Sequence, residues 1–336
     1  MTAEPLLAIR DLRVTFPMFR RTVHAINGCS LSVESGRIVG LVGESGSGKS
    51  VTALASLGLL PPSAGVRGSI RLAGREIVGC SSDTLASVRG GTAAMIFQNP
   101  TTALNPYFTI GRQMADVIRL HRERDARRAL ARAEEALAQT GLPDAAAQLD
   151  KYPHQLSGGQ LQRVMIAMAL ACEPALLIAD EPTTALDVTV QAQIIVLLRD
   201  LAERTGLSVL FITHDLGVVA SLCDSVTVMY AGSVVEHGAV GDIFDHPAHP
   251  YTRKLMDTVP MLGTGRRDFV AIAGQVPDLS RLPAGCPFHP RCELATETCS
   301  REAPAWQDIG TGHGAACHYP ERPLHQVANG NRSAVK

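Results

Sequence analysis

The order of apolar and polar residues along the chain predicts short strands in its first part. The alternating segments Leu6–Phe16 and Ser30–Glu34 are typical of half-buried strands. Arg37–Val42 is a compact apolar run that leads into a glycine-rich loop. Ser69–Leu72 and Glu76–Val78 flank a short turn and predict a hairpin.

From about Thr109 to Gln148 the pattern changes to helical periodicity, and Leu161–Cys172 predicts a further helix. Strands and helices then alternate along the chain. The segments are a buried strand at Ala175–Ala179, a helix at Val190–Arg204, and strands at Leu207–Thr213 and Ser225–Tyr230. This alternation indicates an α/β fold with a doubly wound parallel sheet.

After about Asp245 many prolines interrupt regular structure, which predicts a separate, loop-rich module. We therefore divide the chain into residues 1–245 and 246–336. The length of 336 residues suits one large α/β domain with such an appendage, or two domains.

Composition and charge narrow the function classes. Hydrophobic residues make up 46% of the chain, which is enough for a sizeable core. The net charge of -1 argues against a nucleic-acid partner held by overall positive charge. No apolar run approaches the ~18 residues that span a bilayer, and the N-terminus has no secretory-signal pattern. We therefore expect a cytoplasmic protein.

The loop after Arg37–Val42 reads GESGSGKS, from Gly43 to Ser50, and matches the phosphate-binding pattern GxxxxGK[ST]. Its backbone N–H groups and the following helix N-terminus favour phosphate oxygens. Lys49 would neutralise phosphate charge and Ser50 would bind Mg²⁺. The predicted ATP-binding residues of this segment are Gly43, Ser45, Gly46, Ser47, Gly48, Lys49, Ser50 and Val51.

An acidic pair follows the buried strand Ala175–Ala179. A carboxylate at the C-terminal end of a parallel strand faces the crevice in which phosphates bind, so Asp180 is predicted to hold Mg²⁺. Glu181 would orient and polarise the attacking water.

Leu156–Gln160, with the sequence LSGGQ, resembles the signature motif of ABC-type ATPases. Other motifs of that family follow its order: Phe97-Gln98 resembles the Q-loop, Thr184–Asp187 the D-loop, and Thr213–Asp215 the segment with the switch histidine. Phe16 stands where the family has its adenine-stacking aromatic residue, with Phe19 as a rival. The resemblance implies a RecA-like parallel sheet, an antiparallel β subdomain and a helical subdomain at about 99–160.

The same resemblance implies the roles of these residues. Gln98 joins Ser50 and Asp180 at Mg²⁺, and His214 contacts the γ-phosphate. The catalytic residues are then Glu181, His214 and Lys49. Asp187 belongs to the D-loop. The signature residues close over ATP held by another subunit, which implies a head-to-tail dimer; they are Ser157, Gly158, Gly159 and Gln160.

The C-terminal module resembles that of oligopeptide/dipeptide importer ATPases, a subfamily that also includes nickel importers. The segment His246–Thr252 carries the HPY sequence found after the core in this subfamily. Four cysteines follow with the spacing C-x5-C-x6-C-x17-C: Cys286, Cys292, Cys299 and Cys317. The spacing leaves a [4Fe–4S] cluster, tetrahedral Zn²⁺ and unligated thiols open. The resemblance implies the [4Fe–4S] cluster.

The resemblance therefore implies an ATP-hydrolysing subunit at the cytoplasmic face of the inner membrane that powers import of di- or oligopeptides. Its implied partners are two transmembrane permease subunits, an extracytoplasmic substrate-binding protein and a second ATPase subunit, either a paralogue or a second copy. Two alternatives stay open: a soluble ABC ATPase acting on nucleic acid or in translation, and an importer of nickel or another solute.

Overall fold

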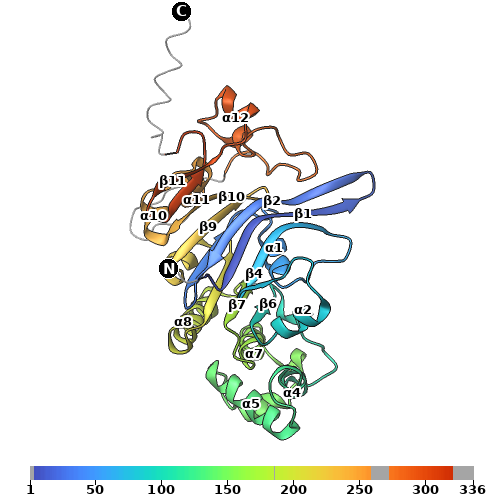
Figure 1. Cartoon of the computed structure of the whole chain (residues 1–336). Helices are drawn as coiled ribbons and strands as arrows, with labels where there is room; N and C mark the ends of the chain where they lie inside the picture. The colour runs from blue at the N-terminus through green and yellow to red at the C-terminus, as the bar shows by residue number, and fades with distance from the viewer. Residues whose placement is uncertain (1–3, 185, 259–271, 321–336) are drawn as a thin grey trace, which may run out of the picture.

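A computed structural model describes residues 4–184, 186–258 and 272–320, and two sheets organise it (Figure 1). The smaller sheet is antiparallel and has the order β2-β1-β4-β5. Its strands are β1 (Leu7–Met18), β2 (Arg21–Val33), β4 (Gly65–Leu72) and β5 (Arg75–Glu76). The larger sheet has the order β11-β12-β10-β9-β3-β8-β7-β6.

The larger sheet is parallel from β9 to its edge strand β6. The parallel strands are β3 (Ile38–Val42), β6 (Ala93–Ile96), β7 (Leu176–Asp180), β8 (Ser208–Thr213) and β9 (Ser225–Tyr230). Every residue of β3, β7 and β8 is buried, which explains why these strands read as continuous apolar runs without alternation. The carboxyl ends of these neighbouring strands meet at one edge of the sheet.

Helices cover the sheets and form a layer at one end of the molecule. The helices are α1 (Lys49–Ser56), α2 (Ser82–Val88), α3 (Pro100–Ala103), α4 (Ile110–His121), α5 (Ala126–Gln139), α6 (Ala145–Leu149), α7 (Gly158–Leu170), α8 (Val188–Thr205), α9 (Leu216–Leu222), α10 (Val240–Asp245), α11 (Pro250–Asp257) and α12 (Glu297–Arg301). Short 3-10 helices lie at Pro153–Gln155 and His289–Arg291. Within the described ranges, no helix combines the length and the apolar character that a membrane crossing requires.

The helical subdomain has its own apolar core. Ile110, Met114 and Ile118 of α4 pack with Leu137 of α5 and Val164 of α7. In Figure 1, α4 and α5 lie at the end of the molecule opposite α12. This subdomain, the antiparallel sheet and the parallel sheet confirm the predicted fold class.

The C-terminal residues extend the larger sheet. The strands β11 (Trp306–Gly310) and β12 (His313–Ala316) continue it beyond β10 (Ser233–Ala239). Phe288 joins Tyr230 of β9 and Tyr251 of α11 in one core, with ring centroids 5.1 and 5.3 Å away from its own. Residues before and after position 245 share this sheet and this core. The domain boundary near residue 245 stays a prediction.

Candidate nucleotide-binding site

The glycine-rich loop joins β3 to α1, as its sequence predicts. Gly43 and Gly48 have φ of 151° and 104°, values that residues with a side chain rarely adopt. A Cβ atom on Gly43 would lie 2.2 Å from the Met229 carbonyl oxygen, and one on Gly48 would lie 2.8 Å from that of Ala25. Among the described residues, no side chain caps the N-terminus of α1, so this helix start is open to an anion.

Lys49 lies inside this loop and is buried. Its Nζ atom donates hydrogen bonds to the carbonyl oxygens of Gly43 and Glu44, at 2.7 and 3.0 Å. Burial lowers the pKa of Lys49, and the nearby carboxylates of Glu181 and Asp180 oppose that shift. A bound phosphate would supply the negative charge that stabilises this buried ammonium group.

Asp180 and Ser50 meet beside the loop. The Ser50 hydroxyl donates a hydrogen bond to Asp180 Oδ1 at 3.0 Å. Burial raises the pKa of Asp180, whereas this hydrogen bond lowers it. A hydroxyl and a carboxylate are the oxygen ligands that Mg²⁺ prefers, so the donors fit the predicted metal.

Glu181 brings the remaining predicted catalytic residues together. Its carboxylate accepts hydrogen bonds from Gln98 Nε2 and from the Thr184 hydroxyl, both at 2.9 Å. Nδ1 of His214 lies 3.5 Å from Glu181 Oε1. Glu181 has a φ of 47°, a strained value for a residue with a side chain. This backbone conformation directs the Glu181 carboxylate toward Gln98, which follows β6, and His214, which follows β8.

The two aromatic candidates for adenine differ in exposure. Phe16 is half-buried and packs against the core beneath the antiparallel sheet. Phe19 is 87% exposed. Phe16 lies in β1 and Phe19 in the turn between β1 and β2, and the choice of Phe16 stays a prediction.

The signature residues open α7. Ser157 and Gln160 form a capping box, in which the Ser157 hydroxyl accepts from Gln160 N and Gln160 Oε1 accepts from Ser157 N. A Cβ on Gly159 would come within 2.8 Å of Val190 in α8, and Asp187 caps that helix by accepting a hydrogen bond from Val190 N at 2.9 Å. The signature and the D-loop therefore lie side by side.

The four C-terminal cysteines are all free thiols and line one cavity of about 20 Å³. Burial raises the pKa of Cys286 to about 11, and the sulfurs of Cys317 and Cys299 add to the shift. His249 also lines the cavity, and its buried Nε2 has no hydrogen-bond partner among the described residues.

These donors fit a thiolate-bound metal in kind and number. In the described part of the chain, however, no group of three or more His, Cys, Asp or Glu side chains is placed so that it could hold one metal ion. The predicted [4Fe–4S] cluster thus has no preformed ion site to support it and stays a prediction.

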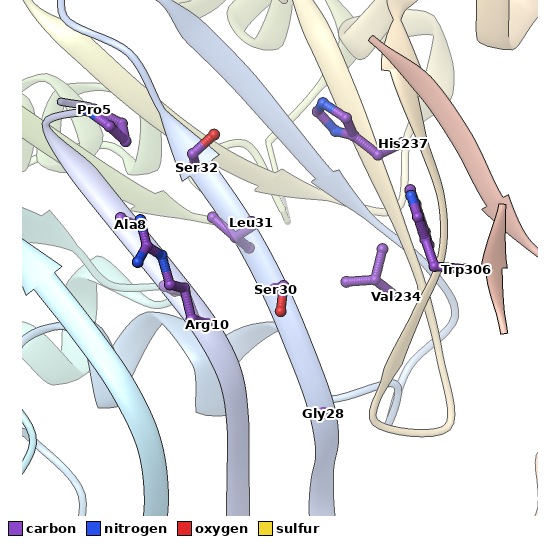
Figure 2. Close-up of a pocket in the computed structure, with 11 residues that line it drawn as sticks. Pro5, Ala8, Arg10, Gly28, Ser30, Leu31, Ser32, Val234, His237 and Trp306 are labelled. Carbon is purple, nitrogen blue, oxygen red and sulfur yellow. The ribbon is translucent and has the colours of Figure 1, made fainter. Parts of the chain in front are cut away.

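A larger cavity of about 620 Å³ is lined by residues of β1 and β2 on one side and of β10 and β11 on the other. Figure 2 shows Arg10, Ser30, Ser32, His237 and Trp306 around it. None of the predicted ATP-binding residues lines this cavity, so the predicted nucleotide site and this cavity are separate.

Comparison with known proteins decides the family. Residues 26–184 match the ABC transporter model, and residues 235–299 match that of the oligopeptide/dipeptide transporter C-terminal region. The chain is 49% identical to the probable D,D-dipeptide transport ATP-binding protein DdpD of Escherichia coli (strain K12), over 96% of this chain and 99% of that protein. The chain belongs to the ABC transporter ATP-binding proteins of the oligopeptide/dipeptide type.

Further relatives agree with this family. The oligopeptide transport ATP-binding protein OppD of Escherichia coli (strain K12) is 46% identical over 96% of this chain and 95% of its own length. The dimeric structure of the ATP-binding cassette MJ0796 bound to ADP and Pi superposes with a TM-score of 0.62 at 28% identity, covering 70% of this chain and 98% of that chain.

Sequence reasoning placed Thr184 and Glu44 in motifs but missed the contacts that each makes at the site. Thr184 holds Glu181, and Glu44 connects the glycine-rich loop to the C-terminal residues. Thr184 follows Glu181 by three positions, which is a local signal. Glu44 occupies a variable position of the loop pattern, and no sequence signal marks it.

Proposed function

We propose that this chain is the ATP-hydrolysing subunit of a transporter that imports di- or oligopeptides. The observation that carries the proposal is the convergence of Gln98, His214 and Thr184 on Glu181, beside the loop that holds Lys49. The match of residues 235–299 to the oligopeptide/dipeptide C-terminal model supports peptides as the solute.

The residues divide the chemistry among them. The loop N–H groups and Lys49 bind the phosphates and neutralise their charge. Ser50, Asp180 and Gln98 would hold Mg²⁺, which supplies Lewis-acid stabilisation of phosphate charge when bound. Glu181 accepts a proton from the attacking water and orients it, while His214 stabilises charge that develops on the γ-phosphate.

We further propose that hydrolysis requires two ATPase subunits. The signature residues Ser157–Gln160 would cover ATP on the other subunit, and Asp187 lies beside them. The dimeric arrangement named for MJ0796 supports this assembly. A paralogue and a second copy of this chain both stay open as the partner.

The remaining partners follow from peptide import. Membrane permease subunits would carry the solute, and a substrate-binding protein would deliver it from the other side of the membrane. The chain would then lie at the inner face of the membrane, bound to the permeases through its helical subdomain.

For the C-terminal thiols we propose a metal site held by Cys286, Cys292, Cys299 and Cys317, with a [4Fe–4S] cluster ahead of Zn²⁺. The shared cavity and the four free thiols support it. The ligand bonds would strengthen a segment with few regular elements.

The ATPase proposal is tested with Glu181→Gln. We expect ATP to bind with unchanged affinity while hydrolysis falls about 100-fold or more, because the base is lost. Co-purification with permease subunits and ATP-dependent peptide uptake into vesicles test the transport function. Salt-sensitive retention on nucleic acid without permease binding would favour the soluble ATPase instead.

Metal and acid-labile sulfide analysis of protein purified without oxygen tests the thiol site. About four iron and four sulfide per chain are expected for a cubane cluster. One zinc per chain without sulfide would indicate a structural zinc site in place of the cluster. The absence of both iron and zinc would refute a metal site.

A further inference from the structure

Residues from the C-terminal part of the chain hold the phosphate-binding loop at Glu44. The Glu44 carboxylate accepts hydrogen bonds from both terminal nitrogens of Arg291, at 2.7 and 3.0 Å. Its backbone N–H donates to the Tyr251 hydroxyl at 2.9 Å, and its carbonyl oxygen accepts from Lys49 Nζ at 3.0 Å. Every polar group of Glu44 is thus engaged, and one of its partners is the phosphate-binding lysine.

Arg291 is itself fixed in place. Its side chain is 4% exposed, and its guanidinium also donates to the carbonyl oxygens of Ala273 and Ile272 at 2.9 and 3.1 Å. A further hydrogen bond of 3.3 Å reaches the Tyr230 hydroxyl. A buried, bidentate arginine with several fixed acceptors has one orientation, unlike the mobile partners of an exposed ion pair.

Tyr251 is fixed in the same way. Its ring packs against Tyr230, with the centroids 4.6 Å apart. The turn that precedes it is held by the buried carboxylate of Glu236, which accepts from the N–H groups of Ala248 and His249 at 2.7 and 2.8 Å. The Tyr251 hydroxyl therefore reaches the loop from a rigid base.

We propose that Arg291 and Tyr251 are positioning residues for ATP: by holding Glu44 from outside, they set the shape of the phosphate-binding loop and the place of Lys49. The Glu44 N–H points to Tyr251, so this part of the loop takes its conformation from the C-terminal segment. Without that contact, Glu44 and the Lys49 side chain bonded to it are free to shift away from the phosphates. This inference rests on the proposed ATPase function and does not depend on what the cysteines bind.

A double-mutant cycle on the full chain tests it. Arg291→Met and Glu44→Gln are each expected to raise the Kd of a fluorescent ATP analogue by about fivefold or more. The Kd of the double variant should not exceed that of the single variant with the larger Kd, because both substitutions remove the same contact. In hydrolysis by the assembled transporter, the KM for ATP should rise while kcat changes less. Tyr251→Phe removes only the hydroxyl and is expected to raise the Kd by about twofold.

Glu293→Gln is the matched control. Glu293 lies on the other side of Cys292 from Arg291 and pairs with Lys254, so its loss disturbs the same segment without touching the loop. We expect its Kd to equal that of the unmodified chain. Folded variants at Arg291, Glu44 and Tyr251 with unchanged Kd, or a rise as large in Glu293→Gln, would overturn the inference. Failure of the unmodified chain to bind the analogue would instead refute the ATPase function.

Discussion

The helices α1 and α7 both begin in glycine-containing loops, and they satisfy their first amides differently. Gly48 caps α1 without any side-chain hydrogen bond, whereas Ser157 and Gln160 form a capping box at α7. The amides of α1 are therefore open to a ligand, and some of those of α7 are occupied by the chain itself. The start of α1 can therefore receive an anion, whereas the start of α7 is a preformed helix end that would need further contacts to bind one.

Individual glycines of the two loops differ as well, although Gly159 of the second loop is also restricted, because its Cβ would lie 2.8 Å from Val190. Gly43 and Gly48 are required by their own chain, because a Cβ would collide with backbone oxygens at 2.2 and 2.8 Å. A Cβ on Gly158 would meet only the Leu186 side chain, at an ordinary 3.7 Å. The fold of this chain therefore does not need glycine at 158. A group that approaches from outside, such as ATP on a second subunit, would explain the open space.

The largest effect is expected at the first loop. Lys49→Ala removes the charge that binds the phosphates, so hydrolysis should fall about 100-fold or more and ATP affinity should fall with it. A steady-state ATPase assay and a titration with a fluorescent ATP analogue measure the two effects. Lys151→Ala is the control, since Lys151 lies outside the loop. Retention of ATP binding by Lys49→Ala would remove this loop as the site.

Gly158→Ala separates the two loops most directly. Alanine is the better helix former, so the free energy of unfolding should stay equal or rise by up to about 1 kcal/mol. ATP affinity of the single chain should not change, because the first loop is intact. Hydrolysis by the assembled transporter should fall about tenfold, since the added methyl group occupies the space for the other subunit's ATP. Full activity of this variant would show that the signature does not contact nucleotide closely.

Motif resemblance in the sequence marked Gln98, Glu181 and His214, and the strands that precede these residues explain why they meet. Gln98 comes after β6, Glu181 after β7 and His214 after β8, and carboxyl ends of adjacent parallel strands meet at one edge. The motifs supply the polar side chains, and the adjacent strands of the sheet bring these side chains close together. The parallel strands β3, β7, β8 and β9 were predictable from their continuous apolar runs, whereas the short strand β6 before Gln98 was not predicted.

Other features were not predictable, because they depend on contacts between distant segments. Arg291 and Glu44 are 247 positions apart, and no sequence motif indicates that they are in contact. The strand β2 begins at Arg21 rather than near Ser30, because its first residues are polar and exposed and show no alternation. The addition of β11 and β12 to the larger sheet likewise depends on the path of the chain after residue 272.

The smallest expected effect is at the cap of α7. Ser157→Ala removes one of the two hydrogen bonds of the capping box and should lower the free energy of unfolding by about 1 kcal/mol. Ser81→Ala is a matched control, because Ser81 caps α2 by accepting a hydrogen bond from Thr84 N. Both variants should lose similar stability in urea unfolding.

Only Ser157→Ala should also lower hydrolysis by the assembled transporter, by about fivefold, with ATP affinity of the single chain unchanged. Equal hydrolysis in the two variants would mean that Ser157 only caps α7. The two loops would then differ in how their helices are capped, and the second loop would not contact ATP through Ser157. A loss confined to Ser157→Ala assigns its hydroxyl two partners: the amide at the start of its own helix and a phosphate brought by another subunit.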